Sequence, residues 1–287
     1  MTIKACVIGH PIAHSLSPVL HGFWLDQYKI DGTYTRKDIA PENLETGLKS
    51  LISDGYAGLN VTIPHKQNIM PLLDNIDDIA RKIGAVNTVV IDDQGKTHGT
   101  NTDAYGFIQN LKSQIPNWPK AASGHVSGQT EKTALILGAG GAARAVLFAL
   151  SQDGFSRIHL SNRSFDKAQR LAQEFTTDLT EIIPTNWEGK EAHLPNADLL
   201  VNTTCLGMVG QSDLKIDLKS LKETAVICDI VYTPLITPLL QQAQLNGHPT
   251  VTGLGMLLHQ AASGFEKWFK IQPTVSDKLE QHVLNHT

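Results

Sequence analysis

Short apolar runs alternate with segments of helical period along the chain, and this alternation predicts an α/β protein whose strands are mainly parallel. In the first third of the chain the pattern predicts four strands and one helix. The strands are at 4–8, 33–38, 58–61 and 87–91, and the helix is at 41–52. Pro41 is tolerated in the first turn of a helix, and three leucines lie on one face: Leu44, Leu48 and Leu51.

A second set of elements follows the stretch 117–132. This stretch is rich in glycine, serine and proline and has no apolar period, so it predicts a flexible surface segment near a domain junction. Beyond it the pattern predicts strands at 133–137, 157–161, 198–202 and 225–230, with helices after the first two. The last segments, 254–269 and 275–285, are predicted to be helical, with no further strand.

Length and composition narrow the class of protein. A chain of 287 residues is long enough for two domains, each with its own core. Charged residues make up 18% and the net charge is −4, so nothing favours a nucleic acid as partner. The three cysteines are far apart, and no apolar run is long enough to span a bilayer. We expect a cytoplasmic protein without disulfides or a membrane segment, and the oligomeric state stays open, with a homodimer among the candidates.

A glycine turn follows the strand at 133–137 and opens the next helix. Its residues form a G-x-G-x-x-A pattern: Gly138, Ala139, Gly140, Gly141, Ala142 and Ala143. Such glycines let the backbone approach a pyrophosphate, which the N–H groups and the positive dipole end of the helix then hold. The pattern predicts a dinucleotide site. A purely structural turn and an S-adenosylmethionine site are the alternatives.

The end of the next strand indicates which dinucleotide binds. NAD sites usually have an acidic residue there to bind the ribose 2′-hydroxyl, whereas this chain has Asn162, Arg163 and Ser164. Arg163 and Lys167 lie four residues apart on the first helical turn, where two cations could hold a 2′-phosphate. The sequence therefore predicts NADP(H), against the alternative that both are solvated surface charges.

The loop after the first strand is rich in serine, histidine and proline. Ser15 and Ser17 are two residues apart, and their hydroxyls could bind a polar ring or a carboxylate; turn formation is the alternative. His10 and His14 have the spacing of a helical metal pair. Because Pro11 interrupts that helix and a third ligand is lacking, we predict no metal.

Three polar residues end other segments of the first domain. Lys66 follows a strand in N-V-T-I-P-H-K, where an amine can exchange a proton with the oxygen of a carbonyl being reduced. Asn87 lies in G-A-V-N-T and Asp103 in N-T-D. The alternatives are a surface lysine for Lys66 and a helix N-cap for Asp103.

Together these motifs resemble the shikimate dehydrogenase family, in order and across nearly the whole chain. They are S-x-S, N-V-T-I-P-x-K, G-A-V-N-T, N-T-D, G-A-G-G-A-A-R, N-R-S, N-T-T-x-L-G-M, V-Y-x-P-x-x-T-P-L and G-L-G-M-L-L-x-Q-A-A. The resemblance implies NADP-dependent, reversible reduction of 3-dehydroshikimate to shikimate. It also implies an N-terminal α/β substrate domain (1–104 and 254–287), a Rossmann-type NADP-binding domain (105–253) and an active site in the cleft between them.

The resemblance further assigns roles to single residues, with Lys66 and Asp103 as the catalytic pair. The substrate contacts that it implies are Ser15, Ser17, Thr62, Lys66, Asn87, Asp103, Tyr232 and Gln260. The cofactor contacts that it implies are Gly138, Ala139, Gly140, Gly141, Ala142, Asn162, Arg163, Ser164, Lys167, Thr203, Met208, Ile230 and Gly253.

Three residues depart from the common pattern of the family. Ser164 replaces a threonine, Cys205 replaces a serine near the expected nicotinamide pocket, and His65 stands directly before the lysine. Two rival functions remain. The basic turn after 157–161 disfavours a quinate/shikimate dehydrogenase that uses NAD, and the presence of both Lys66 and Asp103 disfavours a catalytically silent sensor of metabolites.

Overall fold

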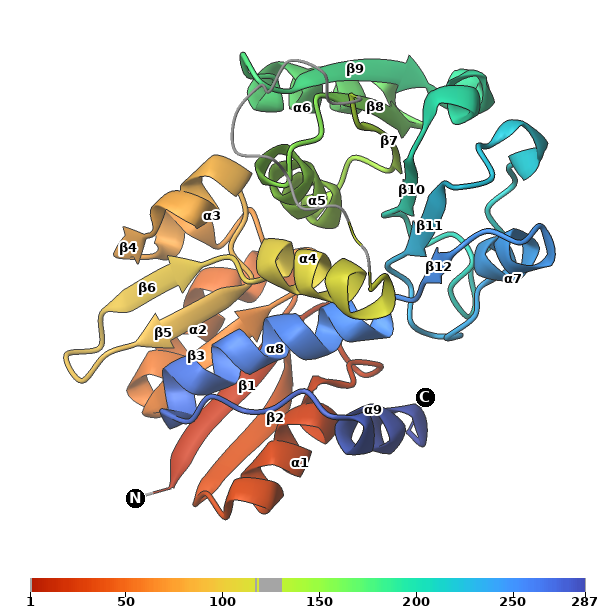
Figure 1. Ribbon diagram of the computed structural model, residues 1–287. Helices are drawn as coiled ribbons and strands as arrows, with labels where there is room; N and C mark the ends of the chain where they lie inside the picture. The colour runs from red at the N-terminus through yellow and green to blue at the C-terminus, as the bar shows by residue number, and fades with distance from the viewer. Residues whose placement is uncertain (1, 117, 119–130, 287) are drawn as a thin grey trace. The chain divides into compact units, whose positions relative to one another are not determined.

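The computed structural model describes residues 2–116, 118 and 131–286, which form two compact units (Figure 1). Unit 1 comprises Met1–Gly106 and Leu257–Thr287, and unit 2 comprises Phe107–Met256. Most of the stretch 117–132 lies outside the described residues, so its flexibility stays a prediction. Within the described residues, no helix is long and apolar enough to cross a membrane.

Unit 1 is built on a six-stranded mixed sheet of order β2-β1-β3-β5-β6-β4. Its strands are β1 (Ile3–Gly9), β2 (Gly32–Asp38), β3 (Tyr56–Val61), β4 (Asn75–Ile76), β5 (Thr88–Ile91) and β6 (Thr97–Thr100). β1 is parallel to β2 and β3, but β5 is antiparallel to both β3 and β6. β4 pairs with β6 in parallel, so these two antiparallel pairs are exceptions to the mainly parallel pairing that the sequence predicts; the link between β5 and β6 is too short for a crossover.

The helices of unit 1 come from both ends of the chain. They are α1 (Ser17–Tyr28), α2 (Leu44–Ser53), α3 (Asp78–Ile83), α9 (Asp277–Leu284) and parts of α4 (Asp103–Gln114) and α8 (Leu254–Phe269). The helix expected at 41–52 begins with a 3-10 turn, Pro41–Asn43, before α2; a second 3-10 turn is Met70–Leu72. The two junctions between units fall inside α4 and α8, after Gly106 and Met256, whereas the sequence placed them after residues 104 and 253.

Helix α8 packs against the face of the first sheet (Figure 1). The indole Nε1 of Trp268 donates a hydrogen bond of 2.9 Å to the carbonyl oxygen of Val89 in β5. A side chain on Gly58 of β3 would bring its Cβ to 2.1 Å from the same indole nitrogen. Only glycine fits at residue 58, and the absence of a side chain there allows Trp268 of α8 to pack on the sheet.

Unit 2 has a parallel six-stranded sheet of order β12-β11-β10-β7-β8-β9. Its strands are β7 (Thr133–Leu137), β8 (Arg157–Asn162), β9 (Glu181–Asn186), β10 (Leu199–Asn202), β11 (Val226–Asp229) and β12 (Thr250–Val251). Its remaining helical elements are α5 (Gly141–Gln152), α6 (Phe165–Phe175), α7 (Pro238–Leu245) and the 3-10 segments Trp187–Asn196 and Leu218–Ser220. Counted from β7, the strand order is that of a Rossmann fold. The predicted α/β class is confirmed.

Candidate active site

Two backbone hydrogen bonds bring the segment after β3 beside the segment before β5. The N–H of Val61 donates to the carbonyl oxygen of Asn87 (2.8 Å), and the N–H of Val86 donates to that of Lys66 (2.8 Å). The N–H of Asn87 in turn reaches the carbonyl oxygen of Thr100, at 3.2 Å, just before α4 begins. Segments that lie apart in the sequence thus deliver their polar side chains to one place.

Lys66 and Asp103 form an ion pair at that place. The Nζ of Lys66 lies 2.5 Å from Oδ2 of Asp103, with the lysine side chain 18% exposed and the aspartate side chain 7% exposed. Oδ1 of the same carboxylate accepts from Nδ2 of Asn87 at 2.8 Å. Asp103 is the first residue of α4, and its own N–H is held by Oδ1 of Asn101 (3.0 Å). The carboxylate is therefore fixed, while the ammonium stays partly accessible.

Asn87 connects this pair to helix α8. Its side chain is buried, and its Oδ1 accepts from the N–H of Thr102 (2.8 Å) and the hydroxyl of Thr88 (3.0 Å). Its Nδ2 also lies 3.2 Å from Oε1 of Gln260. Four residues predicted from the sequence thus form one hydrogen-bonded cluster: Lys66, Asn87, Asp103 and Gln260.

Ser15, Ser17 and Thr62 lie on two loops that backbone contacts hold together. The N–H of Thr62 donates to the carbonyl oxygen of Ile8 (3.0 Å), and the N–H of His10 donates to that of Ile63 (3.0 Å). Ser17 is buried at the start of α1, and its N–H donates to Oγ of Ser15 (3.3 Å). Within the described residues, no hydrogen bond joins these three side chains to the cluster of Lys66 and Asp103.

The histidine that precedes Lys66 has a structural contact. His65 is fully buried, and its Nε2 lies 2.7 Å from the carbonyl oxygen of Ile39. Its Nδ1 has no hydrogen-bond partner in the part of the chain that the structure describes. Its N–H also closes a turn by donating to the carbonyl oxygen of Thr62 (2.8 Å). His65 therefore fastens the loop that carries Lys66 to the segment after β2.

In unit 2 the glycine turn after β7 leaves room for an anion. Gly138 has φ +108°, and a Cβ there would lie 2.6 Å from Oγ1 of Thr203, so only glycine fits. Nothing lies within 4 Å of a Cβ built on Gly140. Helix α5 begins at Gly141 without a side-chain cap, which leaves its first N–H groups free to meet a phosphate.

The end of β8 presents two cations. Arg163 and Lys167 are exposed, and neither forms an ion pair with a carboxylate among the described residues. Asn162 supports the turn between them, because its Nδ2 donates to the carbonyl oxygen of Ser164 at 2.9 Å. Both cations are therefore available to a 2′-phosphate, and the residue set fits NADP(H).

A buried carboxylate that the sequence reasoning missed joins the ends of β10 and β11. Asp229 is fully buried and accepts from Nδ2 of Asn202 (3.0 Å), the N–H of Val231 (3.0 Å) and the hydroxyl of Thr237 (2.7 Å). Burial raises the pKa of Asp229 to about 6, although all three hydrogen bonds act to lower it. The available signal was an aspartate at the end of an apolar strand, where ligand-binding loops of such sheets begin.

Asp229 thereby holds the loops that carry the remaining predicted residues of unit 2. Thr203 is buried, and its hydroxyl donates to the carbonyl oxygen of Leu137 (2.7 Å). A Cβ on Gly253 would lie 2.3 Å from the carbonyl oxygen of Ile230, so these two adjoin. Met208 is 39% exposed.

Tyr232 differs from the other predicted substrate contacts, because it lies in unit 2 and they belong to unit 1. Its side chain is half-buried, and burial raises the pKa of its hydroxyl.

Cys205, which replaces a serine of the family pattern, is exposed. Its Sγ lies 3.9 Å from Oε1 of Gln211, which is a weak contact. The backbone of the same loop is held independently, because the N–H of Met208 donates to the carbonyl oxygen of Cys205 (3.2 Å). The loop therefore keeps its shape without a hydroxyl at residue 205.

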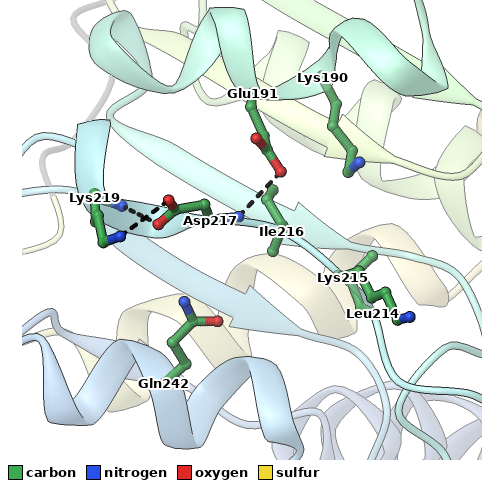
Figure 2. A pocket seen from close by; sticks show the side chains of 8 residues that line it. All are labelled: Lys190, Glu191, Leu214, Lys215, Ile216, Asp217, Lys219 and Gln242. Carbon is green, nitrogen blue, oxygen red and sulfur yellow. Dashed lines mark hydrogen bonds and ion pairs between the residues drawn. The ribbon is translucent and has the colours of Figure 1, made fainter.

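A hollow of about 610 Å³ on unit 2 contains none of the predicted site residues (Figure 2). Two contacts of Asp217 join residues of its lining. Oε1 of Glu191 accepts from the N–H of Asp217 (3.0 Å), and the carboxylate of Asp217 lies 3.5 Å from Nζ of Lys219. This hollow is therefore separate from the chemistry described above.

Family models match most of the chain. The model described as "Shikimate dehydrogenase substrate binding domain" matches residues 7–89, "Shikimate / quinate 5-dehydrogenase" matches 120–247, and "Shikimate 5'-dehydrogenase C-terminal domain" matches 253–276. Two relatives named "Shikimate dehydrogenase (NADP(+))" are similar over 98% of this chain. The protein of Paramagnetospirillum magneticum is 49% identical with 98% of its length covered, and that of Rhodospirillum rubrum is 47% identical with 96% covered.

Solved structures give the same family. Shikimate 5-dehydrogenase of Thermus thermophilus, in complex with NADP(H) and shikimate, has a TM-score of 0.85 and 34% identity, with all of both chains covered. Quinate dehydrogenase of Corynebacterium glutamicum, in complex with NAD, has a TM-score of 0.88 and 30% identity, with 99% of each chain covered. The fold alone therefore does not distinguish shikimate dehydrogenases from quinate dehydrogenases, and the distinction has to come from single residues.

Proposed function

This chain belongs to the shikimate dehydrogenase family, and we propose that it is an NADP-dependent shikimate dehydrogenase with Lys66 and Asp103 as its catalytic pair. It catalyses the reversible reduction of 3-dehydroshikimate to shikimate, on the route to the aromatic amino acids. The observation that carries the proposal is the fixed ion pair of these two residues, with Asn87 and Gln260 beside it.

Lys66 handles the proton of the reaction. NADPH, when bound, supplies the hydride that reduces the C3 carbonyl of the substrate. The ammonium of Lys66 donates a proton to the carbonyl oxygen as negative charge develops there, and in the oxidation direction the neutral amine takes that proton back. Asp103 is a positioning partner that holds the ammonium through the ion pair. The 18% exposure of the lysine side chain supports its access to a substrate.

Polar groups of the same unit orient the substrate. Asn87 and Gln260 offer amide groups beside Asp103, and Ser15, Ser17 and Thr62 offer hydroxyls from the two tied loops. A ring with three hydroxyls and a carboxylate needs several such groups at fixed positions, and correct positioning contributes a large part of the rate. Tyr232 is proposed to complete this set from unit 2.

Residues of the glycine turn and the end of β8 hold NADP(H). The uncapped N-terminus of α5 supports a pyrophosphate site, and the exposed cations Arg163 and Lys167 support a 2′-phosphate site. Thr203, Met208, Ile230 and Gly253 are proposed to line the nicotinamide side. The basic turn and the names of the relatives both disfavour an NAD-dependent quinate dehydrogenase.

The proposed function is tested by following reduced nicotinamide absorbance with shikimate or quinate, each with NADP⁺ or NAD⁺. We expect the kcat/KM for shikimate with NADP⁺ to exceed the other three values. A larger value for quinate or for NAD⁺ would move the chain to the sister activity, and four blanks would reject the proposed function. A cytoplasmic location and a homodimer stay predictions, which cell fractionation and gel filtration with light scattering would check.

A further inference from the structure

We propose that Arg36 is a positioning residue for substrate binding, which fixes the backbone of Ser15 with a two-pronged hydrogen bond. Nε of Arg36 donates to the carbonyl oxygen of Ser15 at 2.8 Å, and Nη2 donates to the same oxygen at 2.6 Å. The inference rests on the proposed function, in which the hydroxyl of Ser15 binds the substrate.

The geometry restricts both members of this contact. A guanidinium is planar, and two of its N–H groups that converge on one oxygen fix the direction of the carbonyl as well as its distance. Arg36 lies on β2, which is the edge strand of the sheet, opposite Val7 in the register with β1. The arginine therefore reaches the loop after β1 from a paired strand, which is a firmer base than another loop.

The same strand holds the loop at two other points. Oδ1 of Asp38 lies 2.6 Å from Nδ1 of His10, and its Oδ2 accepts from the N–H of Ile12 at 3.4 Å. Residues two apart on a strand point to the same side, so Arg36 and Asp38 face the loop together. This pair of residues is the outer clamp of the loop.

Apart from its contact with Arg36, Ser15 has fewer contacts that fix its backbone than Ser17 has. Its N–H closes a turn to the carbonyl oxygen of Ile12 (3.1 Å), but that partner belongs to the same loop. Ser17, by contrast, is the first residue of α1 and is held by the helix. Without Arg36 the peptide after Ser15 could rotate, and the substrate would have to order it on binding, which weakens affinity.

Arg36 also carries a charge without a carboxylate partner in the described part of the chain. Arg36 could therefore affect the binding of an anionic substrate in two ways. Its charge could attract the substrate, or its hydrogen bonds could position Ser15. Substitution by lysine separates them, because lysine keeps the charge but cannot direct two N–H groups from a rigid plane. We infer positioning, since Nε and Nη2 of Arg36 both end on Ser15.

The test compares R36M, R36K and the control K37M. Lys37 is the next residue on β2, also exposed, and its ammonium lies 5.7 Å from the ring centre of Tyr56. We expect R36M and R36K each to raise the KM for shikimate about tenfold, which corresponds to about 1.4 kcal/mol. The KM for NADP⁺ and the melting temperature should stay near those of K37M. Unchanged KM for shikimate in both arginine variants, or full rescue by R36K, overturns the proposal.

A double-mutant cycle with S15A shows through which group Arg36 acts. If Arg36 positions the hydroxyl of Ser15, adding R36M to S15A should raise the KM for shikimate much less than R36M does alone. An equal rise in both backgrounds contradicts the proposal. The cycle also separates two kinds of failure. An unchanged KM in S15A itself would reject the proposed role of Ser15, whereas a raised KM in S15A without any effect of R36M rejects only the inference on Arg36.

Discussion

Asp103 in unit 1 and Asp229 in unit 2 are buried aspartates at or just after the end of a strand, and the two carboxylates differ in their partners. Asp103 accepts from the ammonium of Lys66 and the amide of Asn87. Asp229 accepts only from neutral donors, among them Asn202 and the hydroxyl of Thr237. Both are nearly or fully buried, at 5% and 0% exposure. Burial therefore does not distinguish them, and the charge of the partner does.

This difference shows what each carboxylate is for. The charge of Asp103 is matched by a lysine that stays partly exposed, and we propose that the pair offers this ammonium to the substrate. The carboxylate of Asp229 is enclosed, and burial raises its pKa to about 6. It ties loops together and offers nothing to a ligand directly. A buried aspartate at a strand end is thus evidence for catalysis only when a reachable proton carrier accompanies it.

The largest effect is expected from removing the proton carrier. Lys66→Met should lower kcat about 10²-fold to 10⁴-fold, the usual contribution of a general acid or base. Steady-state kinetics in the oxidation direction would measure it, with Lys82→Met on the exposed side of α3 as the control. A variant with near-normal kcat and unchanged KM for shikimate would remove Lys66 from the mechanism.

Replacing each aspartate by asparagine should sharpen the comparison. In Asp103→Asn the new NH₂ group must face either the ammonium of Lys66 or the amide of Asn87, so donor meets donor and kcat should fall about 10²-fold. In Asp229→Asn the NH₂ group can donate to Thr237, whose hydroxyl is able to accept. That variant should keep most of its kcat, and a similar loss in both variants would contradict the distinction.

The difference in pH dependence of stability between the wild type and Asp229→Asn should report on Asp229, because the other groups with shifted pKa values, such as His21, are common to both proteins. The pKa of Asp229 in the folded protein, about 6, lies above the ordinary value of 3.8, so the folded chain binds the extra proton between these values. The contribution of Asp229 to stability is therefore complete below about pH 4 and is lost as the pH rises to about 6. At about 1.4 kcal/mol per unit the total is roughly 3 kcal/mol. Urea titrations of both proteins across this pH range would measure the slope as the difference between their free energies of unfolding, and a constant difference would contradict it.

The smallest effect is expected from Arg163, an exposed cation of unit 2 that is proposed to bind the 2′-phosphate. Arg163→Ala should raise the KM for NADPH about tenfold, because a charge-assisted hydrogen bond to phosphate is lost, and should leave the KM for NADH unchanged. Arg170→Ala, an exposed arginine of α6, is the matched control. An equal rise for NADPH and NADH would reject the assignment of the 2′-phosphate.

The sequence predicted the elements that periodicity marks clearly. β7 and α8 were predicted with the limits that the structure gives, because one is a continuous apolar run and the other a long amphipathic helix. β9 was missed, since Pro184 and several polar residues interrupt its apolar pattern at the sheet edge. The hairpin of β5 and β6 was missed because β6 is only four residues with one glycine and no large apolar side chain.

Among site residues, the sequence predicted those that motifs carry and missed those defined by contacts. Lys66, Asn87, Asp103 and Gln260, four of the predicted residues, lie in one hydrogen-bonded cluster in unit 1, and their roles stay predictions. Asp229 and Arg36 were not predicted, because their roles depend on distant partners. Asn202 lies 27 positions from Asp229, and Ser15 lies 21 positions from Arg36. No local pattern of residue types encodes such pairings, which arise only when strands are placed side by side.

The packing of α8 on the first sheet sets an order for assembly on the ribosome. Unit 2 is one continuous stretch, so the nascent chain can complete it while the segment from Leu257 onward is still unmade. Until Trp268 emerges, its indole cannot cover the first sheet at Gly58 and Val89. Unit 1, which carries Lys66 and Asp103, is therefore the last part to be completed, although most of it is synthesised first.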